Sequence, residues 1–98
     1  MNKALILIID DERRLVRSLQ LALEADGYGI AAAHTGNDGI ETALDRQPDL
    51  VLLDLRLPDL SGLEVLKQLQ LQLPACPVVM FSAHGDIKVA IEALKSGA

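Results

Sequence analysis

The chain has 98 residues, which is the size of one small domain. Half of the residues are apolar, but only Tyr28 and Phe81 are aromatic, so we expect an aliphatic core. The net charge of -5 argues against direct binding to nucleic acid or to an anionic membrane, and no stretch is long enough to span one. The single cysteine excludes an internal disulfide, and the short apolar start does not fit a signal peptide, so we expect a cytoplasmic protein.

Short apolar runs alternate with segments of helical periodicity from one end of the chain to the other. The predicted strands cover residues 5–9, 28–33, 50–53 and 77–81, and the predicted helices cover 12–26, 38–46, about 62–73 and 87–96. On the third helix we expect the buried face to carry Leu63, Leu66, Leu69 and Leu73. Strict alternation with short connections predicts an α/β fold, a doubly wound parallel sheet.

Acidic and hydroxyl side chains stand where three of these strands end. Asp10 and Asp11 follow the first strand, Asp54 follows the third, and Ser82 follows the fourth. Because the carboxyl ends of parallel strands share one rim, we expect these side chains to meet there. Such a group suits a divalent cation and a phosphoryl group, and without a cation the crowded carboxylates would raise at least one pKa.

The site residues differ in the roles they could take. Mg²⁺ is usually coordinated by one or two protein carboxylates and keeps several waters. We therefore predict that Asp11 and Asp54 are direct ligands and that Asp10 binds a water on the metal. Asp54 is the candidate nucleophile for an aspartyl phosphate, because it stands alone at a central strand end, and Ser82 could donate to a phosphoryl oxygen. The plainer alternatives are solvated loop acids for Asp10 and Asp11 and an ordinary helix cap for Ser82.

Three blocks of the sequence carry a resemblance to a known family. Residues 7–12 read LIIDDE, residues 54–62 read DLRLPDLSG, and residues 77–86 read PVVMFSAHGD. They resemble, in order and over the whole chain, the receiver domains of two-component response regulators. The last block, with the run to residue 98, is most similar to receivers of nitrogen-regulation-type activators.

The resemblance implies a flavodoxin-like receiver fold and a role for each matched residue. Asp54 would be the phosphoacceptor, Asp10 and Asp11 the acidic pocket, Ser82 the switch hydroxyl, and the backbone carbonyl of Arg56 a further ligand of Mg²⁺. It also implies a sensor histidine kinase as partner and a separate output domain, for example a DNA-binding one. Such a domain is a signalling module rather than an enzyme, although it can catalyse its own phosphorylation and dephosphorylation.

One departure from the family pattern concerns the C-terminus. Receivers continue into a fifth strand, which ends in a Lys-Pro pair, and a fifth helix, whereas this chain ends at Ala98. We therefore expect residues 1–98 to form a receiver domain of four βα units that lacks the last one, either a shortened form of a longer regulator or a natural fragment. The family's lysine would be absent, since Lys88 and Lys95 match neither position. The strand at 77–81 would be an exposed edge, where we expect self-association.

Two other functions stay open on the sequence. The chain could be a receiver-like interaction module that does not take phosphate, because the family's lysine and last strand are absent. It could also be a Mg²⁺-dependent phosphatase with an aspartyl-phosphate intermediate. Such enzymes usually need a second acid two residues after the nucleophile, and Arg56 occupies that position.

Overall fold

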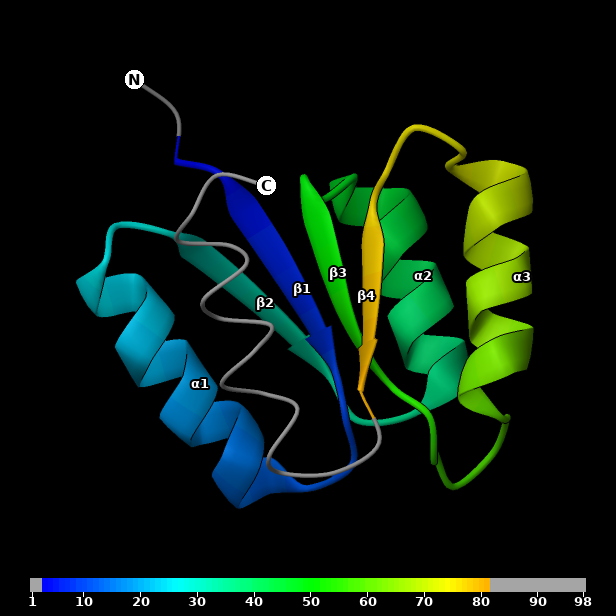
Figure 1. Ribbon diagram of the computed structural model, residues 1–98, viewed down its shortest axis with the longest axis horizontal. Helices are drawn as coiled ribbons and strands as arrows, with labels where there is room; N and C mark the ends of the chain where they lie inside the picture. Colours follow the sequence, from blue (N-terminus) through cyan, green and yellow to red (C-terminus); the bar gives the residue numbers. More distant parts are fainter. Residues whose placement is uncertain (1–2, 82–98) are drawn as a thin grey trace.

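A computed structural model describes residues 3–81; residues 1–2 and 82–98, including Ser82 and the predicted fourth helix, lie outside the described part. Strands and helices alternate, as predicted (Figure 1). The elements are β1 (Leu5–Ile9), α1 (Arg13–Ala25), β2 (Gly29–Ala33), α2 (Gly36–Arg46), β3 (Leu50–Asp54), α3 (Gly62–Gln72) and β4 (Val78–Phe81). Within residues 3–81, no helix is long and apolar enough to cross a membrane.

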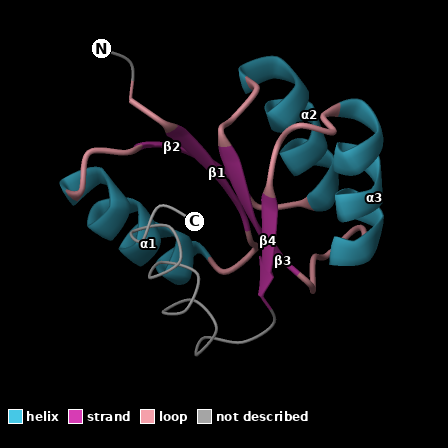
Figure 2. Ribbon diagram, turned by 45° about the horizontal axis from the view of Figure 1, so that its top comes forward, coloured by secondary structure: helices cyan, strands magenta, loops and turns pink. Residues whose placement is uncertain are grey.

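The four strands form one parallel sheet in the order β2-β1-β3-β4. Helix α1 covers one face, and α2 and α3 cover the other, as Figures 1 and 2 show. The chain moves outward from β1 to β2 and then returns to place β3 on the other side of β1. This reversal confirms the predicted doubly wound fold, and in such folds the crevice for a ligand lies at the carboxyl ends of the two strands beside the reversal.

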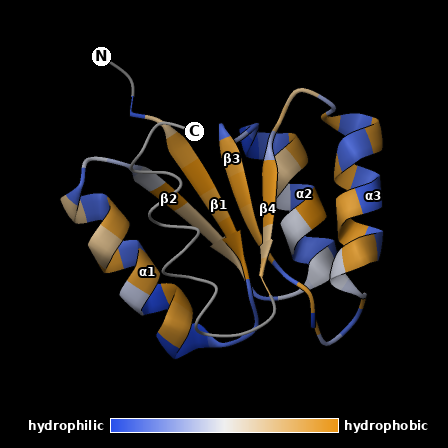
Figure 3. Ribbon diagram, in the orientation of Figure 1, coloured by the Kyte–Doolittle hydropathy of each residue, from blue (hydrophilic) through white to orange (hydrophobic). Residues whose placement is uncertain are grey.

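The core is mainly aliphatic on both faces of the sheet, as the composition predicts, and Phe81 adds a buried aromatic ring on the α1 face. Because successive residues of a strand point to opposite faces, Ile6 and Ile8 pack with α1, whereas Leu7 and Ile9 pack with α2 and α3. The central strands β1 and β3 are therefore hydrophobic along their length (Figure 3). A sheet with apolar side chains on both faces needs helices on both, which explains the layered arrangement.

Two details of the helices differ from the sequence prediction. Helix α2 begins at Gly36 rather than at residue 38, because the hydroxyl of Thr35 accepts the N–H of Asp38 and caps the helix. On α3 the predicted buried face is wrong at Leu63, whose side chain is 62% exposed. The fully buried positions of α3 include Val65 and Leu69.

Strand β4 lies at one edge of the sheet within residues 3–81, and its residues 78–80 are half-buried. Self-association through this strand stays a prediction. The opposite edge is β2, which lies beside β1 alone.

Candidate functional site

The three predicted acidic residues lie together at the carboxyl ends of β1 and β3. Ile9 is the register partner of Leu53, so Asp10 and Asp54, the residues that follow them, reach the same rim. Each of Asp10, Asp11 and Asp54 offers a carboxylate oxygen, and these oxygens lie within 4.8 Å of one another. The group lies at the carboxyl ends of the two strands beside the reversal in strand order, which is where ligands bind in doubly wound folds.

Asp10 is the buried member of the group, with 1% of its surface exposed. Its pKa is raised from 3.8 to about 6, chiefly by burial and also by the neighbouring carboxylates of Asp54 and Asp11, while the N–H of Glu12, which donates to Oδ1 at 2.9 Å, opposes the rise. An ionised carboxylate in this place is therefore destabilised unless a cation compensates it. Asp11 is exposed and Asp54 is half-buried, so both can face a ligand that arrives from solvent.

The loop after Asp54 is closed tightly on itself. The N–H of Arg56 donates to Oδ1 of Asp54 at 3.3 Å, and the N–H of Gly62 donates to the carbonyl of Leu55 at 2.8 Å. Arg56 also forms an isolated antiparallel bridge with Ser61. At Gly62 a Cβ atom would lie 2.5 Å from the carbonyl oxygen of Asp54, so only glycine allows this approach. The loop thus starts from the acidic rim and returns beside it.

A further carboxylate, that of Asp59, fixes this loop to α2, and the sequence analysis assigned it no role. Its two oxygens accept the N–H groups of Gly36 at 2.7 Å and of Asn37 at 2.9 Å. These two bonds, that of Asn37 first, hold the pKa of Asp59 below its usual range. A carboxylate is favourable at a helix N-terminus, where backbone N–H groups lack partners inside the helix. The partners are more than twenty residues apart, so no local pattern signals the contact.

The remaining predicted residues lie around or outside this group. The ring Nδ1 of His34 is 2.9 Å from the carbonyl oxygen of Asp10, which joins the end of β2 to the rim. Ser82, the predicted switch hydroxyl, lies outside the described residues. The role of the Arg56 backbone carbonyl as a metal ligand stays a prediction.

Comparison with known proteins identifies the family. The model of the response regulator receiver domain matches residues 6–98, so the chain belongs to that family of two-component signalling proteins. The fold and the three sequence blocks are explained by this membership. The receiver domain of Methanospirillum hungatei superposes with a TM-score of 0.82 at 28% identity, covering 99% of this chain and 78% of that one.

The relatives are regulators of transcription by name. YkoG of Bacillus subtilis, an uncharacterized transcriptional regulatory protein, is 42% identical over 98 residues, which are all of this chain and 43% of the relative. AlgB of Pseudomonas putida, an alginate biosynthesis transcriptional regulatory protein, is 42% identical over 98 residues, which are 99% of this chain and 22% of the relative. The chain therefore spans less than half the length of these curated relatives.

Proposed function

We propose that this receiver domain accepts a phosphoryl group on Asp54 from the phosphohistidine of a sensor kinase. The proposal rests on the position of Asp54. It is the last residue of the central strand β3, and one of its carboxylate oxygens lies within 4.8 Å of carboxylate oxygens of Asp10 and Asp11. Packing does not explain why three acidic residues lie at one rim, because neighbouring negative charges destabilise one another.

The chain's own groups favour one oxygen of Asp54 as the nucleophile. Oδ1 accepts the N–H of Arg56, which leaves Oδ2 free of that bond. Attack by a carboxylate oxygen on phosphorus forms a P–O bond while the P–N bond of the phosphohistidine breaks, and the imidazole leaves with the electron pair of that bond. The product is an aspartyl phosphate, and catalysis consists mainly of positioning and charge compensation.

The donor set at the rim fits Mg²⁺. Asp11 and Asp54 would hold the ion directly, the buried Asp10 would hold a water bound to it, and the carbonyl of Arg56 would complete the shell. When bound, Mg²⁺ compensates the charge of the carboxylates and of the incoming phosphoryl oxygens. The fit is supported by the raised pKa of Asp10, since an anionic, partly dehydrated carboxylate is stabilised by a cation.

The phosphorylated aspartate would act as a switch rather than as a step in turnover. In this proposal the hydroxyl of Ser82 donates to the phosphoryl group, and the segment after β4 changes between two arrangements. Output passes to a further domain, in keeping with the greater length of the relatives, and transcription is the regulated process that their names suggest. The interaction module without phosphorylation remains the alternative.

Labelling of the full chain tests the proposal. Incubation with Mg²⁺ and acetyl phosphate should give one labile phosphate adduct by mass spectrometry, and Asp54→Asn should lose it. Steady release of phosphate without an adduct would favour the phosphatase, and neither adduct nor release would favour the interaction module. An adduct of equal yield in Asp54→Asn would refute the assignment of Asp54.

A further inference from the structure

The outer edge of β2 offers backbone groups for another strand. The N–H of Gly29 donates to the carbonyl of Ala4, and the carbonyl of Ala33 accepts the N–H of Asp10, so residues 29, 31 and 33 face β1. Because backbone groups alternate along a strand, those of Ile30 and Ala32 point to the other side. Within residues 3–81 no strand pairs there, since β2 is the first strand in the sheet order.

The sequence of β2 contains none of the residues that commonly keep other strands away from a sheet edge. Protein edges are usually blunted by proline, a bulge or charged side chains, whereas β2 reads Gly-Ile-Ala-Ala-Ala. Ala32 is exposed and has the smallest side chain that a strand can carry besides glycine. An added strand could therefore approach to the usual spacing of about 4.8 Å.

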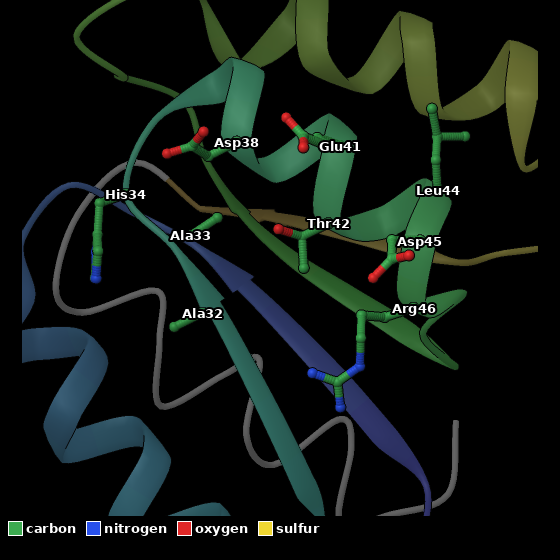
Figure 4. A pocket seen from close by; sticks show the side chains of 9 residues that line it. All are labelled: Ala32, Ala33, His34, Asp38, Glu41, Thr42, Leu44, Asp45 and Arg46. Atoms are coloured by element: carbon green, nitrogen blue, oxygen red, sulfur yellow. The ribbon is translucent and has the colours of Figure 1, made fainter.

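A groove of about 740 Å³ runs beside this edge (Figure 4). Its wall on the sheet side includes Ala32 and Ala33, and its wall on the helix side is formed by α2. A volume in the range of about 300–1,000 Å³ is typical of sites that hold an organic ligand, so there is room for long side chains.

The helix wall of the groove is acidic. Asp38, Glu41 and Asp45 follow one another at helical spacing on α2, all three are exposed, and Arg46 is the one cation of α2 beside them. Within residues 3–81 none of these three carboxylates takes part in an ion pair. Along the helix axis Glu41 and Asp45 are about 6 Å apart, close to the ~6.6 Å between alternate side chains of a strand.

We propose that the β2 edge and the acidic groove form a docking surface for an extended basic segment of a partner protein. The segment would pair with the N–H and C=O groups of Ile30 and Ala32 and direct lysine or arginine side chains, at alternate positions, to Glu41 and Asp45. A second copy of this chain fits less well, because pairing of two β2 strands would bring two acidic stripes together. Strand addition at β2 does not depend on phosphoryl transfer at Asp54.

The test uses a short peptide of alternating lysine and valine, titrated into isotope-labelled full chain and followed by NMR. Amide signals of Ile30 and Ala32 should shift, and a matched peptide with glutamate for lysine should leave them unchanged. Glu41→Gln with Asp45→Asn should raise the Kd about tenfold, as expected for two exposed ion pairs. Glu24→Gln with Glu64→Gln, which removes equal charge elsewhere, should leave the Kd unchanged.

A backbone variant tests the pairing itself. Ala32→Pro removes the outward N–H, and proline is tolerated on an edge strand, so the fold should persist by circular dichroism while peptide binding is lost. Equal affinity in the charge variants, shifts centred on Asp10 and Asp11 instead, or no binding to the unaltered chain would each overturn the proposal. So would shifts at Ile30 that grow with protein concentration in the absence of peptide, which would indicate pairing between two copies.

Discussion

The carboxylates of Asp10 and Asp54 stand at the ends of neighbouring strands, and the charge of Asp54 contributes to the raised pKa of Asp10. The sheet itself imposes this closeness, because the register of β1 with β3 sets the two residues side by side. Without a bound cation, the ionised form of Asp10 therefore lowers the stability of the fold at the proposed phosphorylation site.

This loss of stability predicts an unusual pH dependence. The folded pKa of Asp10, about 6, lies above its ordinary value of 3.8, so between these values the folded state binds more protons than the unfolded one. The contribution of Asp10 to stability thus falls as pH rises through this window, by an amount of order 2 to 3 kcal/mol at neutral pH. Asp10→Asn, which keeps an acceptor for Glu12, should be more stable than the unaltered chain near pH 7 and gain little near pH 4.

Denaturant titrations in EDTA at several pH values measure this difference. The comparison isolates Asp10, because all other titrating groups are common to both proteins. Parallel stability curves, with the same gap near pH 4 as near pH 7, would contradict the raised pKa.

Asp11 should dominate the affinity for Mg²⁺. It is exposed and can turn toward an ion, whereas Asp10 is buried and already accepts the N–H of Glu12. Asp11→Ala should weaken binding by at least about tenfold, a loss seen even for residues that only support a ligand, and Asp10→Ala should weaken it less. Calorimetric titration measures both, with Asp45→Ala, a carboxylate distant from the rim, as control. Unchanged affinity in Asp11→Ala would rule out its role as ligand.

The contact of Asp59 with α2 should stabilise the loop after the acidic rim. Asp59→Ala leaves two N–H groups of the first helical turn without their partner, so we expect a lower Tm and faster hydrogen exchange at Gly36 and Asn37. Asp59→Asn, which keeps one acceptor oxygen, should lie in between. The low pKa of Asp59 means that this stabilisation is lost as pH falls through the folded pKa. Exchange rates that match those of the unaltered chain would show that the bonds are dispensable.

Gly62 should not tolerate even the smallest side chain. A Cβ atom there would lie 2.5 Å from the carbonyl oxygen of Asp54 and 2.6 Å from Cα of Leu55, and backbone cannot give way as a side chain end does. We expect Gly62→Ala to destabilise the fold by about 1–3 kcal/mol, the range for overpacked sites. Gly29→Ala, whose Cβ would meet Leu5 at an ordinary 3.7 Å, is the matched control. Equal denaturation midpoints for the two variants would refute the close approach.

The alternating strands and helices could be predicted because each has a local pattern of apolar residues. The grouping of Asp10, Asp11 and Asp54 could be predicted because the carboxyl ends of parallel strands lie at the same edge of the sheet. The prediction failed at Leu63, since α3 carries leucines around much of its circumference, and the side that packs on the sheet is the one with Gly62, Val65 and Leu69. The role of Asp59 was missed because it depends on hydrogen bonds between distant segments, which no local pattern of residues records. The start of α2 was missed for a different reason: its signal is local, the cap that Thr35 provides to Asp38.

The most direct test of the central claim is chemical trapping of the phosphorylated residue. Borohydride reduces an aspartyl phosphate to homoserine, so peptide sequencing by mass spectrometry after acetyl phosphate and Mg²⁺ identifies the acceptor. We predict homoserine at position 54, dependent on the phosphodonor. Homoserine at Asp10, Asp11 or Asp59 in its place, or none anywhere while the chain is labelled, would contradict the assignment of Asp54 as phosphoacceptor.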